Sequence, residues 1–188
     1  MGEAENRNPN VLITGGAGFL GKRIIEEIFA TDSPLTPGVV KVFDLKQYDG
    51  ELEDKIDFIK GDIRNFDEVN KACLNIDIVI HSAALIDWGT KPESELMSIN
   101  VGGTKNVIKA CKENGIKHLV HTSSLDAVFT GKSLVNIDEN QPYPKNHQTT
   151  YCKSKRLGEV AVVEANTDEL STCVLRPSDI YGEADPYH

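Results

Sequence analysis

The 188-residue chain has no apolar run that approaches the roughly 20 residues of a membrane-spanning helix. Its first ten residues, MGEAENRNPN, are polar and lack the apolar core of a secretory signal peptide. The sequence therefore offers neither a membrane anchor nor a secretion signal of its own. We expect a cytoplasmic protein, whose association with a membrane would require sequence beyond this chain.

Basic clusters, paired cysteines and metal-ligand spacings are also missing. The net charge is −9, and no group of lysines and arginines suits a phosphate backbone, so nucleic acid is not an expected partner. The four cysteines are widely separated and include no C-x-x-C pair, which is typical of reduced thiols in a reducing compartment. The five histidines show no metal-binding spacing, so no metal is expected.

What the chain does contain is an alternation of apolar runs with helical patterns. Its composition, 39% hydrophobic and 26% charged, is that of a globular protein, long enough for one domain with a core. The pattern predicts strands near 11–14, 39–44, 58–59, 76–81, 118–122 and 171–175. It predicts helices near 19–30, 62–74, 93–114 and 149–165, and a long loop over 130–148. Such alternation indicates an α/β fold with a doubly wound parallel sheet and helices on both faces.

The most informative segment is residues 10–21, Asn-Val-Leu-Ile-Thr-Gly-Gly-Ala-Gly-Phe-Leu-Gly. A strand, a glycine-rich turn and a helix follow one another directly, with glycines at 15, 18 and 21. Gly15 allows the turn, Gly18 lets the backbone approach a ligand, and Gly21 lets helix and strand pack closely. The N-terminus of such a helix suits a pyrophosphate. Taken alone, the same glycines fit a simple turn equally well.

An acidic residue at the end of the second predicted strand strengthens the nucleotide interpretation. Asp44 follows the glycines by roughly 20 residues, the position that binds the adenosine ribose hydroxyls. A carboxylate there would repel a 2′-phosphate, so NAD is favoured over NADP. The nearby Lys46 weakens this preference, and a solvated carboxylate at a strand end is the alternative.

Three polar residues form the candidate catalytic set. Tyr151 and Lys155 are four residues apart on a predicted helix and therefore share one face. An ammonium group beside a tyrosine lowers its pKa from about 10, which allows the phenolate to accept a hydroxyl proton. Ser124, preferred over Ser123, follows a strand and could bind the substrate oxygen. The alternatives are an exposed Tyr–Lys pair and serines that satisfy a strand end.

The chain resembles the extended short-chain dehydrogenase/reductases over essentially its whole length. The motifs occur in order: Thr14-Gly-Gly-Ala-Gly-Phe-Leu-Gly21, Gly61-Asp-Ile-Arg64, His81-Ser-Ala-Ala84, Asn100-Val-Gly-Gly-Thr104, Thr122-Ser-Ser124, Tyr151-x-x-x-Lys155 and Arg176-Pro177. The resemblance implies a Rossmann-type NAD(P)-binding fold over residues 1–188. It also implies that the active hydroxyl is the second serine, Ser124.

Further cofactor contacts are implied by the same resemblance. Asp62 and Ile63 would flank the adenine, and Ala83 and Ala84 would pass beside the phosphates and the ribose. Lys155 would also hold the nicotinamide ribose. Asn100 is expected to order the catalytic region, although a packing role within a helix fits it almost as well. The implied cofactor contacts are Gly15, Gly18, Phe19, Leu20, Gly21, Asp44, Asp62, Ile63, Ala83, Ala84, Asn100, Tyr151, Lys155 and Pro177.

Two stretches, Ile80 to Gly89 and Cys173 to Glu183, are similar to the 3β-hydroxysteroid dehydrogenase branch of that family. This implies NAD-dependent oxidation of the 3β-hydroxyl of a steroid or sterol, a small-molecule substrate. A nucleotide-sugar epimerase or dehydratase, a flavonol-type carbonyl reductase and a non-catalytic NAD(H)-binding module remain alternatives. Family members often dimerise through helices beside the sheet, but the sequence leaves a homodimer open.

The chain ends at Pro186-Tyr187-His188, where extended members of the family continue. Their later residues add strands and most of a small substrate domain. We therefore expect the cofactor domain and the catalytic residues to be present, and the C-terminal substrate domain to be largely missing.

Overall fold

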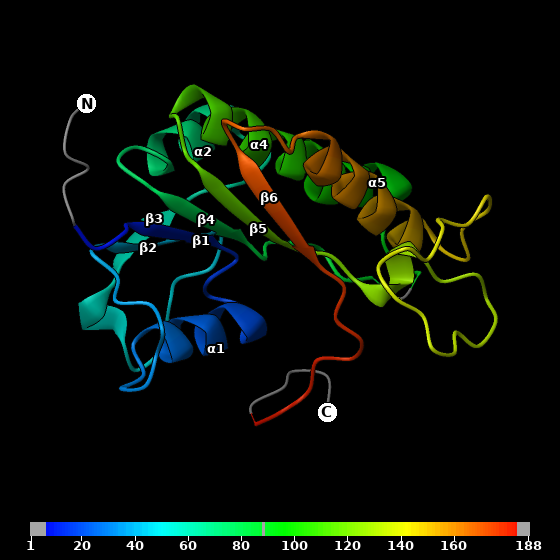
Figure 1. Ribbon diagram of the computed structural model, residues 1–188, viewed down its shortest axis with the longest axis horizontal. Helices are drawn as coiled ribbons and strands as arrows, with labels where there is room; N and C mark the ends of the chain where they lie inside the picture. The colour runs from blue at the N-terminus through cyan, green and yellow to red at the C-terminus, as the bar shows by residue number, and fades with distance from the viewer. Residues whose placement is uncertain (1–6, 88, 184–188) are drawn as a thin grey trace.

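The computed structural model describes residues 7–87 and 89–183; Trp88, the first six residues and the last five lie outside the described residues. The strands are β1 (Val11–Thr14), β2 (Val40–Asp44), β3 (Asp57–Lys60), β4 (Ile78–His81), β5 (His118–Thr122) and β6 (Ser171–Leu175). They pair in parallel throughout, in the order β3-β2-β1-β4-β5-β6 (Figure 1). The predicted doubly wound parallel sheet is confirmed.

The helices are α1 (Phe19–Ile28), α2 (Phe66–Ala72), α3 (Glu93–Leu96), α4 (Thr104–Glu113) and α5 (Thr150–Glu164). Three short or irregular helical segments accompany them: η1 (Glu53–Lys55), η2 (Met97–Gly103) and η3 (Leu125–Ala127). The helix α1 lies on one face of the sheet, and α2, α4 and α5 lie on the other (Figure 1). Helices on both faces are the arrangement that the alternating sequence pattern predicts.

Each face has its own apolar core. Under α1, Ile25 and Ile28 pack against the alternate residues of β1 and β2, among them Val11 and Val42. On the opposite face, Leu12 and Leu119 lie in a larger cluster with residues of α2, α4 and α5. Because successive side chains of a strand point to opposite faces, continuous apolar runs such as Val-Leu-Ile supply both cores.

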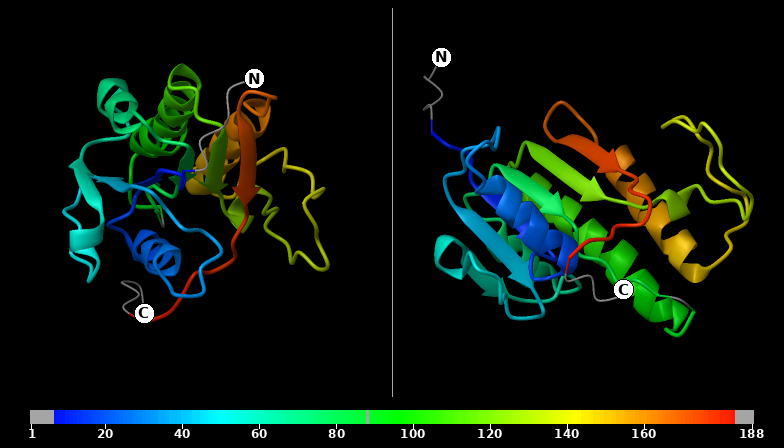
Figure 2. Two further views of the ribbon diagram at one scale, coloured as in Figure 1. Left: turned by 60° about the vertical axis from the view of Figure 1, so that its left-hand side comes forward. Right: turned by 90° about the horizontal axis from the view of Figure 1, so that it is seen from below.

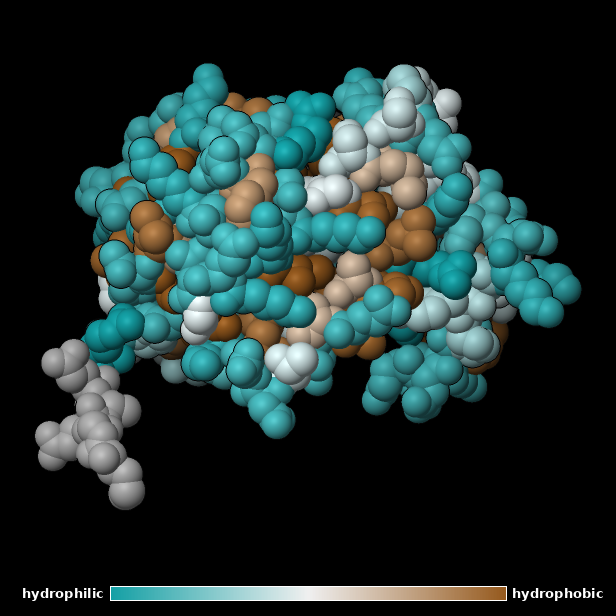
Figure 3. All heavy atoms as spheres, turned by 90° about the horizontal axis from the view of Figure 1, so that it is seen from above, coloured by the Kyte–Doolittle hydropathy of each residue, from teal (hydrophilic) through white to brown (hydrophobic). Residues whose placement is uncertain are grey.

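The two faces are covered unequally. In the right-hand view of Figure 2, α1 lies in front of one end of the sheet, and no described helix lies in front of β5 and β6. The burial of β6 alternates accordingly, with exposed Leu175 on the open face and partly buried Val174 toward α5. The opposite face, seen in Figure 3, is mostly hydrophilic, with apolar residues visible in places among the hydrophilic ones.

Local chemistry shifts several boundaries from the predicted ones. The helix expected from Asp62 begins at Phe66, because the Asn65 side chain accepts hydrogen bonds from the backbone of Asp67 and Glu68 and so caps it. The helix expected over 93–114 contains the π-helical segment η2, a feature often found at functional sites. Tyr48, in a stretch that reads as polar, is almost fully buried in the core under α1.

None of the helices in the described part of the chain has the length and the apolar character needed to cross a bilayer.

Candidate active site

The carboxyl ends of all six strands meet at one edge of the sheet, where ligands of open α/β folds bind. The sequence motifs follow these strand ends one by one. On one half of the sheet, the glycine turn follows β1, Asp44 ends β2, and Gly61 and Asp62 follow β3. On the other half, Ser82 to Ala84 follow β4, the two serines follow β5, and Arg176 and Pro177 follow β6. The fold therefore brings the predicted site residues to a common edge.

At two positions of the glycine turn, a side chain would collide with the backbone. Gly15 has a φ of +74°, and a Cβ there would lie 2.6 Å from the backbone nitrogen of Ala83. At Gly21 a Cβ would lie 2.3 Å from the carbonyl oxygen of Gly15. These clashes match the predicted roles of a tight turn and of close packing between helix and strand. Gly18 is exposed, and a Cβ there would meet only the Gly15 carbonyl, at 3.2 Å.

The helix that follows this turn begins without a side-chain cap and has no acidic residue in its first turn. The N-terminal backbone N–H groups of α1, which start at the half-buried Phe19 and Leu20, thus keep their positive potential. A phosphate group at this position would meet donors and no competing carboxylate from the helix.

Asp44 lies at the end of β2 and is directed back toward the glycine turn. Its carboxylate accepts a hydrogen bond from the backbone of Ala17 at 3.0 Å and one from the backbone of Lys46 at 3.0 Å. The carboxylate is therefore held against the glycine turn, two residues before α1 begins, and its role as a ribose-binding acid stays a prediction. The Lys46 side chain is exposed.

The residues after β3 are fixed by local contacts. Asp62 forms an ion pair with Arg64, whose guanidinium holds the pKa of that carboxyl below its usual value. Ile63 is 7% exposed, and its side chain fills the space beside Gly103 of η2, where a Cβ would lie 2.5 Å away. Little of the Ile63 side chain is left to contact a ligand, so the adenine contact of Ile63 stays a prediction for its backbone only.

The Asn100 side chain holds the segment that follows β4 through hydrogen bonds. From the π-helical segment η2, its side-chain amide donates to the carbonyl of Leu85 at 3.0 Å and to Ser154 Oγ at 2.9 Å. Its Oδ1 accepts from the backbone N–H of Leu85 at 2.7 Å. Through Asn100, the segment containing the half-buried Ala83 and the exposed Ala84 is tied to α5.

The candidate catalytic residues converge on the end of β5. Lys155 is 5% exposed, and its ammonium donates to the carbonyl oxygen of Thr122 at 2.9 Å. Burial lowers the pKa of Lys155 to about 8, while Glu159 and Asp126 oppose this shift. Tyr151 is half-buried one turn earlier on α5. The sequence therefore correctly placed Tyr151 and Lys155 on one helix beside the strand that leads to the serines.

The two serines point to different partners. Ser124 is partly buried, caps η3, and exchanges hydrogen bonds of 3.1 Å with the backbone and the carboxylate of Asp126. Ser123 is 3% exposed, and its hydroxyl donates to Glu159. Ser123 is therefore buried against Glu159, whereas the Ser124 hydroxyl is partly exposed at the edge of the sheet, and its selection over Ser123 stays a prediction.

Sequence reasoning missed Glu159, which is buried one turn after Lys155. Its Oε1 accepts hydrogen bonds from Arg176 Nε at 2.9 Å, Arg176 Nη2 at 2.7 Å and the Tyr143 hydroxyl at 2.7 Å. Arg176, Ser123 and Tyr143 hold the pKa of Glu159 below its usual value, against the effect of burial. The i, i+4 spacing from Lys155 was the available signal, but the partners lie on other elements.

Two stacked histidines lie behind this edge, and the sequence predicted no role for either, although His81 begins the His81-Ser-Ala-Ala84 motif. His81 and His121 have ring centroids 5.0 Å apart, and burial lowers their pKa values to about 3 and about 2. Thr104 donates its hydroxyl hydrogen to the Asn100 carbonyl, so it accepts from His81 Nε2 at 3.0 Å. His81 Nδ1 then accepts from Thr14 at 2.7 Å. Both rings are therefore neutral.

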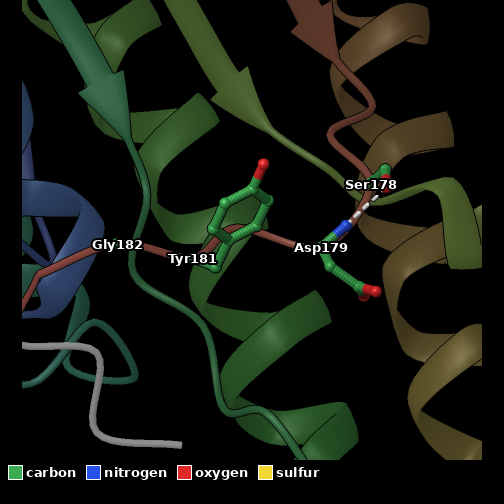
Figure 4. Close-up of a pocket in the computed structure, with 4 residues that line it drawn as sticks. All are labelled: Ser178, Asp179, Tyr181 and Gly182. Atoms are coloured by element: carbon green, nitrogen blue, oxygen red, sulfur yellow. Dashed lines mark hydrogen bonds between the residues drawn. The ribbon is translucent and has the colours of Figure 1, made fainter. Parts of the chain in front are cut away.

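The segment after β6 runs along the same edge toward α1. The carbonyl of Pro177 accepts from the backbone N–H of Leu125 at 2.9 Å, next to Ser124. Farther on, Arg23 of α1 donates to the carbonyl of Glu183 at 2.8 Å. An open hollow of about 630 Å³ is lined by four residues of this segment, and in Figure 4 the ring of Tyr181 and the carboxylate of Asp179 point away from each other. The lining residues are Ser178, Asp179, Tyr181 and Gly182.

Solved structures agree with this fold. The dTDP-glucose 4,6-dehydratase DesIV from Streptomyces venezuelae, crystallised with NAD and TYD, superposes on 89% of this chain and 55% of its own, with a TM-score of 0.77 and 24% identity. MoeE5, solved with UDP-glucuronic acid and NAD, matches 89% of this chain and 54% of its own, with a TM-score of 0.74 and 26% identity.

Sequence relatives are more similar. The 3 beta-hydroxysteroid dehydrogenase/Delta 5-->4-isomerase of vaccinia virus (strain Copenhagen) is 36% identical over 92% of this chain and 53% of its own length. The decarboxylating sterol-4-alpha-carboxylate 3-dehydrogenase of Candida albicans is 36% identical over 94% and 52%. The human 3 beta-hydroxysteroid dehydrogenase type 7 is 37% identical over 92% and 50%. The chain spans about half the length of these relatives.

The model of the 3-beta hydroxysteroid dehydrogenase/isomerase family matches residues 12–188, which include every motif described above. With a Rossmann-type sheet, the glycine turn at its first strand and the Tyr151–Lys155 pair beside its fifth, the chain belongs to the 3-beta hydroxysteroid dehydrogenase/isomerase family.

Proposed function

We propose that residues 1–188 are the cofactor-binding and catalytic part of an NAD-dependent oxidoreductase that acts on the 3β-hydroxyl of a steroid or sterol. The observation that carries this proposal is the buried Lys155 ammonium, which shares the α5 helix with Tyr151 and contacts the strand end that leads to Ser124. The names of the relatives support the substrate class.

The residues at the sheet edge fit a dinucleotide. The uncapped first turn of α1 offers donors to a pyrophosphate, and the Gly15 turn brings the segment after β4 beside it. The contact of the Asp44 carboxylate with the glycine turn supports a role in binding a ribose diol, and its charge would repel a 2′-phosphate, which favours NAD over NADP. NAD in the related crystal structures supports this choice. The residues that would hold NAD are the glycine turn with Phe19 and Leu20, then Asp44, Asp62, Ile63, Ala83, Ala84, Asn100, Tyr151, Lys155 and Pro177.

The chemistry follows from these side chains. Bound NAD would supply the hydride acceptor. Tyr151, as phenolate, accepts the proton of the substrate hydroxyl, and Lys155 lowers the pKa of Tyr151 because an ammonium group stabilises the nearby negative charge. The Ser124 hydroxyl orients the substrate oxygen. In the reverse direction Tyr151 donates the proton to the alkoxide.

The test is a Tyr151→Phe variant in a form of the protein that oxidises a steroid. The variant should lose turnover by at least two orders of magnitude, the scale of a lost general base, while its dissociation constant for NAD stays nearly the same. Steady-state kinetics and calorimetric titration provide the two readouts. Retained turnover would contradict the mechanism.

A second candidate, a nucleotide-sugar-modifying enzyme, is favoured by one observation, the similarity to MoeE5 with its bound UDP-glucuronic acid. A panel of 3β-hydroxysteroids and UDP-sugars discriminates between the two. Steroid oxidation supports the proposal, and UDP-sugar conversion replaces it with the second candidate. Binding of NADH without turnover of either class would indicate a non-catalytic dinucleotide-binding module.

A further inference from the structure

We propose that Glu159 is a positioning residue, which ties the strand end carrying Ser124 to β6 and to the loop over 130–148, one helical turn from Lys155. Its role as a positioning residue rests on the proposed oxidoreductase function. The contacts of Glu159 are formed within the protein chain and involve neither a cofactor nor a substrate.

The geometry makes Glu159 the meeting point of four segments. The residue is 1% exposed on α5, and both carboxylate oxygens are used. One oxygen accepts from Ser123, the neighbour of Ser124 on the β5 side. The other accepts from Arg176, at the end of β6, and from Tyr143 in the loop. A buried carboxylate is costly unless such partners satisfy it, so all three segments are held to α5.

These contacts fix the position of the end of β5, which carries Ser124, relative to Lys155 on α5. The carbonyl that receives the Lys155 ammonium belongs to Thr122, directly before Ser123. Two backbone bonds continue the connection, from Ser123 N–H to the Leu175 carbonyl at 2.8 Å and from Leu125 N–H to the Pro177 carbonyl at 2.9 Å. Glu159 thus holds the strand end on which both Lys155 and Ser124 depend.

The charge of Glu159 has a second effect, on Lys155. Burial lowers the pKa of Lys155, and the carboxylates of Glu159 and Asp126 counteract this. Since the ammonium form stabilises a Tyr151 phenolate, a negative charge near Lys155 extends the pH range in which that form persists. The groups around Lys155 are Glu159 and Tyr151 on α5, Asp126 on η3, and the neutral His81 and His121 on β4 and β5.

The first measurement is the titration of Lys155 by NMR in the cofactor-free chain with ¹³C-labelled lysine, assigned with a Lys155→Met variant. Glu159→Gln keeps the shape of the side chain and removes its charge, so the Lys155 midpoint should fall by at least half a pH unit. Glu164→Gln, on the exposed part of the same helix, should leave the midpoint unchanged. Equal midpoints in wild type and Glu159→Gln would overturn the electrostatic role.

The second measurement does not require a folded Glu159→Gln variant. Ser123→Ala removes one hydroxyl and keeps the ion pair of Glu159 with Arg176. Hydrogen exchange of the Leu125 amide should become at least threefold faster, whereas Ser133→Ala, in the exposed loop, should not change it. Unchanged exchange in Ser123→Ala would overturn the positioning role, and it decides alone if Glu159→Gln does not fold.

These readouts are independent of the substrate. If the Lys155 midpoint and the Leu125 exchange rate respond as expected and no steroid is oxidised, the positioning contacts of Glu159 are supported and the proposed substrate is wrong. In an active form of the enzyme, the alkaline limb of the pH profile of kcat should move to lower pH in Glu159→Gln, because Lys155 loses its proton earlier.

Discussion

At the residue scale, two glycines of this chain differ in the space that they leave for a side chain. Gly15 and Gly115 both adopt a left-handed backbone, with φ of +74° and +65°. A Cβ on Gly15 would collide with the backbone of Ala83, whereas a Cβ on Gly115 would have nothing within 4 Å. Replacement by alanine at Gly115 therefore measures the conformational strain of a positive φ, whereas replacement at Gly15 adds a steric clash to that strain.

We expect Gly115→Ala to lower the free energy of unfolding by about 1–2 kcal/mol, the strain of a left-handed non-glycine residue. Gly15→Ala should cost more than this, because it adds the clash with Ala83. Urea denaturation of both variants measures the difference. Equal losses would contradict the close approach of the segment after β4 to the glycine turn.

A second prediction concerns His121, whose pKa is lowered to about 2 by burial, with neither ring nitrogen hydrogen-bonded within the described chain. Because the folded state does not accept the proton, the unfolded chain binds it first, and stability falls as the pH drops below about 6.5. Between pH 6 and pH 4, His121→Leu should lose less stability than wild type, by about 1.4 kcal/mol per pH unit.

Urea melts at several pH values measure this slope. His118→Leu, at an exposed position of the same strand, is the matched control and should follow the wild type. If the slope of His121→Leu equals that of the wild type, the ring is protonated in the folded state.

At the element scale, the segment η2 connects two parts of the site. The Asn100 side chain makes three hydrogen bonds from this segment, to both backbone groups of Leu85 and to Ser154. An ordinary helical turn would place Asn100 differently, because a π-helical turn inserts an extra residue and rotates the later residues about the helix axis. The helix α5 also packs closely against η2, since a Cβ on Gly158 would lie 2.8 Å from the Asn100 carbonyl.

Asn100→Ala should lower the free energy of unfolding by about 1–3 kcal/mol, the cost of leaving buried polar groups unpaired. It should also speed hydrogen exchange of the Leu85 amide, which loses its acceptor. Exchange mass spectrometry with Asn140→Ala, in the exposed loop, as the control provides the measurement. Unaltered protection at Leu85 would show that Asn100 packs without ordering that segment.

At the scale of the whole molecule, the parallel sheet brings the predicted site residues to the edge at which its strands end. A ligand that binds only the folded state raises the melting temperature, by an amount equivalent to about 2.7 kcal/mol at a hundredfold excess over its dissociation constant. The thermal melt of the chain with either nucleotide therefore tests the fold and the site together.

We expect NAD to raise the melting midpoint more than NADP does at equal concentration, because the proposed role of Asp44 would bring its carboxylate close to a 2′-phosphate and repel it. Asp44→Asn should narrow this difference, since it removes the charge and keeps the hydrogen-bonding shape. Differential scanning fluorimetry provides the midpoints. A larger shift with NADP would assign the opposite preference, and a melt insensitive to both would contradict the dinucleotide site.

Much of this architecture could be predicted from local sequence. The alternation of apolar runs and helical patterns determined the parallel sheet, because strand and helix periodicities are local properties. The glycine turn could be predicted for the same reason, since the positive φ of Gly15 and the contact of Gly21 with the Gly15 carbonyl are local, although the contact of Gly15 with Ala83 is long-range. The four-residue spacing of Tyr151 and Lys155 was sufficient to place both on one helix.

Only the tertiary structure decided which distant groups meet. Ser123 is 36 residues from Glu159, and Arg176 is 17 residues from it, so neither contact is encoded in a spacing. The stack of His81 on His121 depends on the register of β4 against β5. Sequence alone determined the alternation of strands and helices and the motifs they carry, because both are local. The pairing of strands, a long-range property, determined how buried charges and rings are satisfied.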